Sequence, residues 1–381
     1  MVAGPSRAVR TRPWTWPQEG DGRVPDPTDS PLVSVVLPVR DGAAHLPAAR
    51  AGIESLTGPA LEVLVVDDGS TDASAELLAD WAAADPRVRV LTEPAPRGVA
   101  HARNRALTVA RGEYVWLVDA DDTWEPDALD VLVEAARRDR ADVVVCDARR
   151  TLVHEDASIP PAPASPLLDA AAGATTGEEM LRAILRGTLQ GHLWNKLFRR
   201  ETLGTAPFPE QRAHSDLAGL LGVLASGRVG TVAAVPRPLY TYGMRHGSIL
   251  RSDAYDPHDL EGCLAAGWRA AGIPEGPDAA GSRARAAAAG RTQDLALFTH
   301  GLVTVPVVNE HLRRGHDARE TARLTRQQRA RVRPADILTI LRAGRWNLAA
   351  RTVAVRWALP LHAAVYRAYR RRRYGAHDRR G

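Results

Sequence analysis

The 381-residue chain has one lysine and two cysteines, and these scarcities narrow the classes of protein it can belong to. Cys146 and Cys263 are too few for a disulfide framework, and neither lies in a CxxC or Cys/His spacing typical of a metal site. The sequence contains no run of about 18 apolar residues, so we predict no membrane-spanning helix. The N-terminal residues also lack the apolar core of a signal peptide. We therefore expect a cytoplasmic protein.

Two common nucleotide-binding loops are missing as well. The sequence has no GxxxxGKS or GxxxxGKT motif, and Pro38–Gly42, which follows the first predicted strand, does not read GxGxxG. The basic residues are almost all Arg, and Lys196 is the single Lys. The net charge of +5 is modest, and no nucleic-acid recognition motif accompanies it. We therefore predict no nucleic-acid partner.

Short apolar runs rich in β-branched residues alternate with helical patterns over the first 150 residues. This alternation predicts an α/β fold with a mostly parallel central sheet and flanking helices. In open sheets of this kind, ligands bind beyond the carboxyl ends of the strands. The predicted strands are 33–39, 61–66, 88–91, 114–118 and 143–146, and the predicted helices are 44–56, 73–83, 99–110 and 127–137.

The rest of the chain is less regular. Residues 1–30 are rich in Pro and Arg and predict a disordered leader. The run Val229–Val235 predicts a strand that ends at Pro236 and Pro238. From about residue 257 the pattern is helical, and the C-terminal third is strongly basic.

Two carboxylates, Asp119 and Asp121, directly follow the predicted strand 114–118. Side chains at positions i and i+2 can converge on one hard cation, and Mg²⁺ or Mn²⁺ binds through one or two carboxylates plus substrate phosphates. An Asp-x-Asp pair taken alone more often reflects capping or surface solvation. Its place at a strand end, beside the acidic loop Asp67–Asp72, favours a metal site.

With these motifs in view, Val33–Cys146 resembles the donor half of a family 2 glycosyltransferase with the GT-A fold, a Rossmann-like α/β architecture. The resemblance implies metal-dependent transfer of a sugar, with inversion, from a nucleotide sugar that usually contains uridine. The matching segments, in order, are 34–39, 65–72, 102–104, 112–114 and 119–122.

The family pattern implies roles for the nucleotide-binding residues. The backbone of Pro38 and Val39, together with Asp67 or Asp68, would hold the base, and we favour Asp68. Arg103 would approach the phosphates. An Arg on a helix surface that pairs with a neighbouring acid is an equally good interpretation of Arg103.

The same pattern implies roles for the paired carboxylates. Asp119 would lie by the ribose or the metal, and Asp121 would ligate the Mn²⁺ or Mg²⁺ that bridges the diphosphate.

The acceptor half, 148–256, resembles the cell-surface polysaccharide branch, including enzymes of teichoic-acid-like polymers, in 193–200, 208–210, 238–242 and 247–249. Relatives there usually carry Glu-Asp where this chain has Ser215-Asp216. The resemblance implies that Asp216 is the general base that activates the acceptor hydroxyl. The alternative for Asp216 is an N-cap of the following helix.

Three further residues are candidates for sugar or phosphate contacts. Trp194 and Lys196 suggest a loop against the donor sugar or the acceptor, although a lone Lys can also survive by chance. Arg245 is a candidate for phosphate or acceptor contact, with a solvated loop as the alternative. The Gln-x-x-Arg-Trp motif of processive relatives is absent at its expected place, so we predict non-processive transfer.

The basic tail carries apolar residues at helical spacing. Aromatic residues and Arg on an amphipathic helix are typical of peripheral attachment to an anionic membrane, here the inner face of the cell membrane. A helix packed on the rest of the chain, with a solvated basic end, explains the pattern equally well. The apolar residues are Trp346, Val353, Trp357, Leu361, Val365 and Tyr369.

We thus predict a GT-A domain over 31–256, with a donor half at 31–147, and a basic helical region over 257–381. The expected partners are a nucleotide-sugar donor and a glycan or lipid-linked acceptor. Two alternatives stay open. A catalytically inactive relative that only binds nucleotide sugars or scaffolds other proteins would explain the Ser215-Asp216 departure. A nucleotidyltransferase would also use acidic residues in an α/β sheet, but such enzymes usually need a Gly-rich basic loop that Pro38–Gly42 does not provide.

Overall fold

The predicted alternation of strands and helices is present in the computed structural model, which describes residues 32–152, 175–244, 256, 259–274 and 276–374. The predicted leader 1–30 and the candidate Arg245 lie outside these residues. The chain divides into two compact units, and each is described by itself. The first consists of 1–176, 192–210 and 229–246, and the second of 177–191, 211–228 and 247–381.

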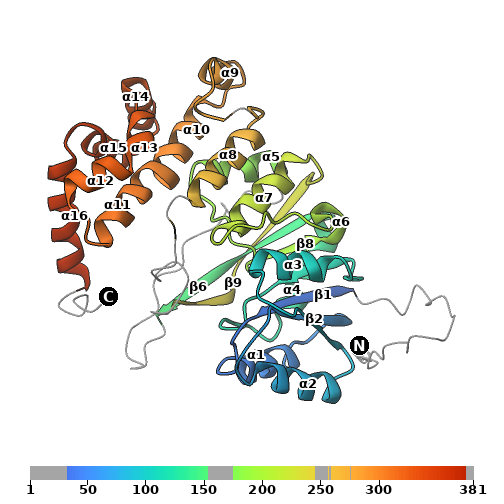
Figure 1. Cartoon of the computed structure of the whole chain (residues 1–381). Helices are drawn as coiled ribbons and strands as arrows, with labels where there is room; N and C mark the ends of the chain where they lie inside the picture. The colour runs from blue at the N-terminus through green and yellow to red at the C-terminus, as the bar shows by residue number, and fades with distance from the viewer. Residues whose placement is uncertain (1–31, 153–174, 245–255, 257–258, 275, 375–381) are drawn as a thin grey trace, which may run out of the picture. The chain divides into compact units, whose positions relative to one another are not determined.

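The first unit contains one sheet, which has nine strands in the described part of the chain (Figure 1). The strands run in the order β3-β2-β1-β4-β8-β6-β9-β5, and β7 pairs with β9. The four N-terminal strands of this order are parallel, whereas β8 is antiparallel to both β4 and β6. The bounds are β1 Val33–Val39, β2 Leu61–Asp67, β3 Val88–Thr92, β4 Tyr114–Leu117, β5 Thr123–Trp124, β6 Val143–Leu152, β7 Thr175–Thr176, β8 Lys196–Arg199 and β9 Thr231–Met244.

The strand order reverses at β1. The chain passes from β1 to β2 and β3 on one side and then returns to place β4 on the other side of β1. Connections leave in opposite directions at such a switch point, which is where open α/β sheets bind ligands. The connecting helices are α1 Leu46–Glu54, α2 Ser74–Ala84 and α3 Val99–Leu107, and α4 Ala128–Asp139 follows the loop after β4.

A buried carboxylate fixes the start of β4 beside β1. Glu62 in β2 is fully buried and accepts hydrogen bonds from Ser34 Oγ at 2.5 Å and from the backbone N–H of Arg111 at 2.7 Å. Gly112 precedes β4, and a Cβ atom there would lie 2.4 Å from Ser34 N. Only glycine therefore allows the chain to enter β4 this close to β1.

Strand β9 differs from the prediction, because it continues through Pro236 and Pro238 to Met244. Proline cannot donate to a strand ladder, so an interior proline normally ends a central strand. Here the pairing with β6 shifts register on either side of Asp147, so that Cys146 faces Val235 and Asp147 faces Pro238. The irregular pairing accommodates prolines that cannot donate hydrogen bonds to the ladder. Strand β9 therefore continues to pair with β5, which follows the loop after β4.

The second unit is helical and includes two segments that we assigned to the acceptor half. Segments 177–191 and 211–228 cluster with the C-terminal helices, so the compact units do not follow a single boundary near residue 256. None of the helices in the described ranges is long and apolar enough to cross a membrane. The helices are α5 Gly177–Leu185, α7 Ser215–Ala225, α8 Asp259–Ala270, α9 Ser282–Ala288, α10 Thr292–Phe298, the π-helix η4 Thr299–Thr304, α11 Val305–Arg313, α12 Ala318–Leu324, α13 Arg326–Ala330, α14 Pro334–Arg342, α15 Trp346–Trp357 and α16 Leu359–Tyr374, while α6 Arg200–Leu203 belongs to the first unit.

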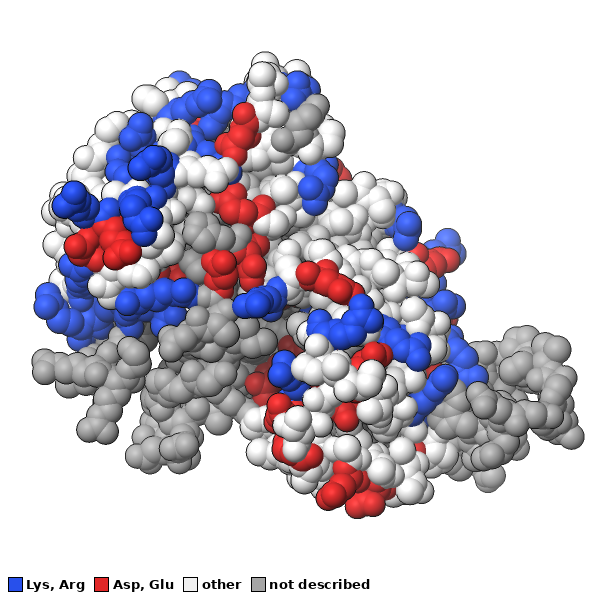
Figure 2. Space-filling model, viewed as in Figure 1, with Lys and Arg blue, Asp and Glu red and all other residues white. Residues whose placement is uncertain are grey.

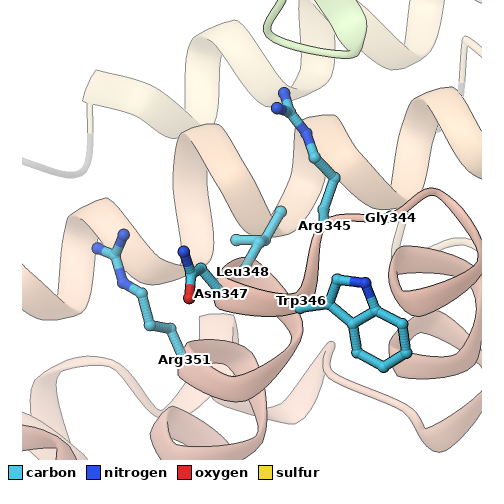
Figure 3. Close-up of a pocket in the computed structure, with 6 residues that line it drawn as sticks. All are labelled: Gly344, Arg345, Trp346, Asn347, Leu348 and Arg351. Carbon is cyan, nitrogen blue, oxygen red and sulfur yellow. The ribbon is translucent and has the colours of Figure 1, made fainter.

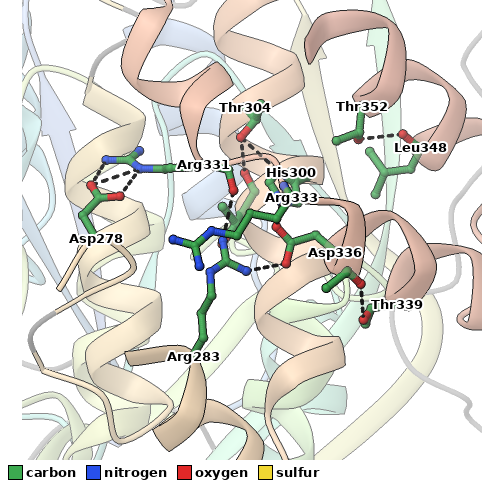
Figure 4. A network of polar contacts seen from close by, with 12 residues as sticks. Asp278, Arg283, His300, Thr304, Arg331, Arg333, Asp336, Thr339, Leu348 and Thr352 are labelled. Carbon is green, nitrogen blue, oxygen red and sulfur yellow. Dashed lines mark hydrogen bonds and ion pairs between the residues drawn. The ribbon is translucent and has the colours of Figure 1, made fainter. Parts of the chain in front are cut away.

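A polar network joins three of these helices (Figure 4). Asp336 at the start of α14 pairs with Arg283 of α9 and lies 3.1 Å from Nε2 of His300 in η4. His300 Nδ1 lies 3.1 Å from the Thr304 hydroxyl, which itself donates to Thr299 O. The network satisfies buried polar groups on all three helices, and we interpret it as structural.

Helix α16 buries one titratable group against α11. His362 is 6% exposed, and its Nε2 lies 2.8 Å from Asn309 Oδ1. Burial and the nearby Arg351 lower the pKa of His362 from 6.5 to about 4. The unfolded chain therefore binds a proton between pH 6.5 and 4 that the folded chain does not bind.

We expect the free energy of unfolding to fall as the pH decreases from 6.5 to 4, by at most about 1.4 kcal/mol per pH unit for this one proton. The variant His362→Gln keeps a donor for Asn309 but cannot titrate, so it should lose this contribution to the slope. Denaturant unfolding of both proteins at several pH values measures the difference. Equal slopes for the two proteins would contradict the prediction.

Candidate active site

The loop Asp119–Asp122 follows β4 at the switch point of the sheet. Asp119 and Asp121 are partly exposed, whereas Asp122 is only 3% exposed. Arg103 of α3 donates from Nη2 to Asp119 Oδ1 at 2.7 Å. Four consecutive residues thus place three carboxylates at the end of β4, next to the end of β1.

The buried Asp122 connects this loop with β9. Tyr240 donates its hydroxyl proton to Asp122 Oδ2 at 2.7 Å, and the Gly243 N–H donates to Asp122 Oδ1 at 2.8 Å. The Tyr240 hydroxyl also accepts a hydrogen bond from the Asp119 N–H at 3.2 Å. Residues more than a hundred positions apart in sequence therefore hold both ends of the loop.

The loop concentrates negative charge. Burial, with a contribution from Asp119 and Asp121, raises the pKa of Asp122 from 3.8 to about 8. Burial, followed by the carboxylates of Asp122, Asp121 and Asp119, also raises the pKa of Tyr242 above its usual value of 10. The part of both shifts that comes from neighbouring carboxylates indicates a negative potential that favours a cation at the loop.

The carboxylates of the loop suit a metal ion that takes most of its ligands from phosphates and water. Within the described ranges, no group of three or more His, Cys, Asp or Glu side chains is arranged to hold a metal ion. Asp119 and Asp121 can offer two carboxylates, and Mg²⁺ or Mn²⁺ typically binds through one or two carboxylates with phosphates and water completing the shell. The residues therefore suit a divalent ion that binds together with a diphosphate.

Two roles were open for Arg103, phosphate contact and pairing with a neighbouring acid. Its side chain is 8% exposed, it pairs with an acid as one interpretation expected, and that acid is Asp119 of the loop. Among the described residues, Arg103 Nε is buried and has no hydrogen-bond partner. A buried cation at the rim of a nucleotide site suits phosphate binding, which stays a prediction for this residue.

The two acids proposed for the nucleotide base are both buried at the end of β2. The two oxygens of Asp68 accept from the backbone N–H groups of Arg97 and Gly98, each at 2.7 Å, and Asp67 Oδ1 accepts from Ser70 N at 3.0 Å. Each carboxylate oxygen keeps a second lone pair. Asp68 thus positions the loop before α3, and its role in base binding stays a prediction.

The backbone of Pro38 and Val39 lies beside this pair of acids. Pro38 pairs with Val66 and Val39 with Asp67 in the parallel ladder, and Val39 O accepts from Asp68 N at 2.8 Å. The structure therefore brings all four candidate base-binding residues together at adjacent strand ends.

Trp194 and Lys196 lie in the interior of the first unit. Trp194 stacks on Tyr240 and Tyr242, with ring centroids 4.7 and 5.5 Å apart. Lys196 is fully buried, and its Nζ donates to His192 O and to Asn195 Oδ1. Both side chains therefore support the core of this unit, and direct sugar contact by either stays a prediction.

Asp216 is placed by helix α7 of the second unit. The N-cap of α7 is His214, so Asp216 occupies the first turn and not the N-cap position that the sequence also allowed. An acid in the first turn is favoured by the helix dipole. The proposed base is partly exposed.

The comparisons with known proteins decide the family. Residues 34–201 match the model of glycosyl transferase family 2. Residues 34–201 thus belong to this family, as the motifs predicted. The matched segment runs from β1 through the end of β8 and includes the acidic loop.

Individual relatives agree with the family 2 assignment. The chain is 26% identical over 227 residues to the putative glycosyltransferase EpsH of Bacillus subtilis, covering 58% of this chain and 64% of EpsH. It is 37% identical over 116 residues to the glycosyltransferase GlyG of Streptococcus pneumoniae, covering 30% of this chain and 38% of GlyG. The chain thus spans less than two thirds of the length of these relatives.

A solved structure extends the likeness over more of the chain. S. aureus TarS 1–349, solved in complex with UDP-GlcNAc, superposes with a TM-score of 0.63 at 18% identity and covers 89% of this chain and 91% of that one. At this identity the likeness concerns the fold. The predicted GT-A architecture with a C-terminal helical region is therefore confirmed.

Sequence reasoning missed two residues of the site, Asp122 and Tyr240. Both lie within segments that carried the resemblance, 119–122 and 238–242, but their types gave no signal of mutual contact. Tyr240 is fully buried and donates to Asp122, so we assign both residues a positioning role.

We predict that Tyr240→Phe lowers the free energy of unfolding by about 1–3 kcal/mol, because the buried Asp122 carboxylate loses a donor. The control Tyr242→Phe keeps the ring stacked on Trp194 and leaves the Asp122 hydrogen bonds in place. Chemical denaturation measures both variants. Equal stability of Tyr240→Phe and wild type would show that the link does not hold the loop.

Proposed function

We propose that this protein transfers a sugar, with inversion, from a UDP-sugar to a hydroxyl of a cell-surface glycan or teichoic-acid-like acceptor, with Mn²⁺ or Mg²⁺ bound at Asp119 and Asp121. The observation that carries the proposal is the acidic loop at the end of β4, beside the switch point of the sheet. Family 2 membership supports the reaction class.

The names of relatives support the substrate class. A further relative is the putative teichuronic acid biosynthesis glycosyltransferase TuaG of B. subtilis, which is 28% identical over 197 residues, 52% of this chain and 73% of TuaG. The TarS structure contains UDP-GlcNAc. A uridine nucleotide and a surface polymer are therefore the donor and acceptor that we infer for this chain.

The proposed reaction needs one base and one leaving group. The Asp216 carboxylate takes the proton of the acceptor hydroxyl while that oxygen forms a bond to the anomeric carbon. The bond between the anomeric carbon and the diphosphate oxygen breaks on the opposite face, which inverts the configuration. A bound divalent ion would supply positive charge to the departing diphosphate, and Arg103, which pairs with Asp119, would add to it. We propose that one sugar is transferred per encounter with the acceptor. If the acceptor is linked to a lipid, the protein would work at the membrane surface.

We expect calorimetric titration of the full chain to show binding of UDP and of one UDP-sugar in the presence of Mn²⁺, and loss of binding in chelator. Release of UDP during transfer distinguishes the proposed reaction from a nucleotidyltransferase, which would release pyrophosphate. Donor binding without transfer or hydrolysis would favour the inactive relative.

We predict that Asp121→Asn, which keeps the side-chain shape but removes the charge, lowers metal-dependent UDP affinity by about tenfold or more. The control Asp80→Asn makes the same charge change at an exposed position of α2. It should bind UDP as the wild type does. Unchanged affinity in Asp121→Asn would remove Asp121 from the metal site.

We predict that Asp216→Asn leaves UDP-sugar binding intact and lowers transfer by about 10²–10⁴-fold, because the amide cannot accept the acceptor proton. Donor binding by calorimetry and transfer by UDP release are measured on the same preparation. Transfer at the wild-type rate would assign the base to another residue.

A further inference from the structure

The last three helices carry an unbalanced charge. Between Ile337 and Tyr374 the sequence contains nine Arg and no Asp or Glu. Figure 2 shows Lys and Arg side chains along the left edge of the view, where Figure 1 draws α16. A surface with this charge attracts anionic partners.

Large exposed apolar side chains gather in the same segment. Within the described ranges, every large hydrophobic side chain that is strongly exposed lies between residues 338 and 369. Scattered apolar residues on a surface are ordinary, but a set confined to neighbouring helices marks an interaction surface. The exposed side chains are Leu338 (48%), Trp346 (68%), Val353 (39%), Trp357 (53%), Leu361 (62%), Val365 (60%) and Tyr369 (54%).

These side chains do not belong to the faces that hold the helices in the unit. The inward faces of α15 and α16 contribute Val355, Leu359 and Ala363 to a buried cluster with Val305 and Val308 of α11. On α16 the exposed residues 361, 365 and 369 follow a four-residue spacing, which places them on one side of the helix. Packing therefore satisfies one face of α16 and leaves this stripe outward.

A pocket of about 400 Å³ opens at the start of α15 and adds polar groups to the surface. Figure 3 shows the guanidinium groups of Arg345 and Arg351 on the same side of the helix, with Asn347 and Leu348 between them and the indole of Trp346 turned away. Two Arg side chains beside an exposed Trp suit a phosphate group at an apolar boundary.

We propose that α15 and α16 dock this protein onto an anionic lipid surface, with the apolar stripe inserted among the acyl chains and the Arg side chains on the lipid phosphates. The charge selects this partner, because the nine Arg of segment 337–374, which contains no Asp or Glu, would repel a second copy of the same segment. Trp and Tyr prefer the interface between water and lipid. No described helix can cross the bilayer, so the stripe lies in the interface. The proposal does not depend on the sugar-transfer reaction.

Sedimentation of the full chain with vesicles tests the docking surface. We expect binding to vesicles of phosphatidylcholine with phosphatidylglycerol, weak binding to phosphatidylcholine alone, and loss of binding at high salt. The triple variant Arg351→Gln, Arg371→Gln and Arg372→Gln should lose about fivefold in affinity per Arg, or about a hundredfold in total. The triple variant Leu361→Gln, Val365→Gln and Tyr369→Gln should lose at least about tenfold.

A matched control removes three exposed Arg elsewhere, through Arg137→Gln, Arg138→Gln and Arg228→Gln. This control should bind vesicles nearly as the wild type does. If the control and the triple Arg variant lose the same vesicle affinity, the loss follows from net charge alone, and the proposal is overturned. UDP binding should stay unchanged in all three variants, so a failure of docking and a failure of the proposed reaction give separate readouts.

Two measurements on the wild type cover the case of a variant that does not fold. Hydrogen exchange of the vesicle-bound protein should slow in residues 346–369, and exchange that slows only elsewhere would overturn the proposal. Light scattering in solution should show no self-association through this surface. An oligomer that dissociates when the stripe is replaced by Gln would identify a second copy as the partner instead.

Discussion

The hydrogen bonds of the buried Asp122 carboxylate connect the loop after β4 with strand β9, and the candidate site depends on this connection. Burying a carboxylate without hydrogen-bond donors lowers the free energy of unfolding. The hydrogen bonds from Tyr240 and Gly243 to Asp122 therefore stabilise the loop in this position. Tyr240 stays in place because Trp194 stacks on it and because β9 continues past two prolines. The position of two partly exposed carboxylates therefore follows from a core that reaches from β4 to β9.

Charge is divided between two parts of the chain. Burial, with a contribution from Asp119 and Asp121, raises the pKa of Asp122, and the acidic loop suits a cation. In segment 337–374, by contrast, every Asp, Glu, Lys or Arg is an Arg. Each part lies in its own compact unit. The first suits a metal-bound diphosphate and the second suits lipid phosphates, so the two proposed functions use opposite electrostatics and can be tested apart.

Much of the fold and part of the site were readable from the sequence. Strand β1 has the predicted bounds, and the helix predicted over 73–83 is α2 Ser74–Ala84, which differs by one residue at each end. Such elements are predictable because apolar periodicity is a local property. Strand β9 was predicted to end at Pro236, since nothing in its own residues announces the register shift with β6. Lys196 was a candidate because it is the only Lys, yet its side chain is buried in β8. The rarity of a residue type does not indicate whether its side chain points toward a site or into the core.

The sequence by itself determined the family, the alternation of elements and the acids at the strand ends, because these depend on residue types at short and regular spacing. It also determined the apolar stripe of the tail, whose spacing is helical. Only the tertiary structure decided that Tyr240 holds Asp122, that Arg103 pairs with Asp119 and that the tail stripe faces outward while another face packs on α11. Each of these is a contact between distant segments, and such contacts depend on how the sheet and helices pack and not on local spacing.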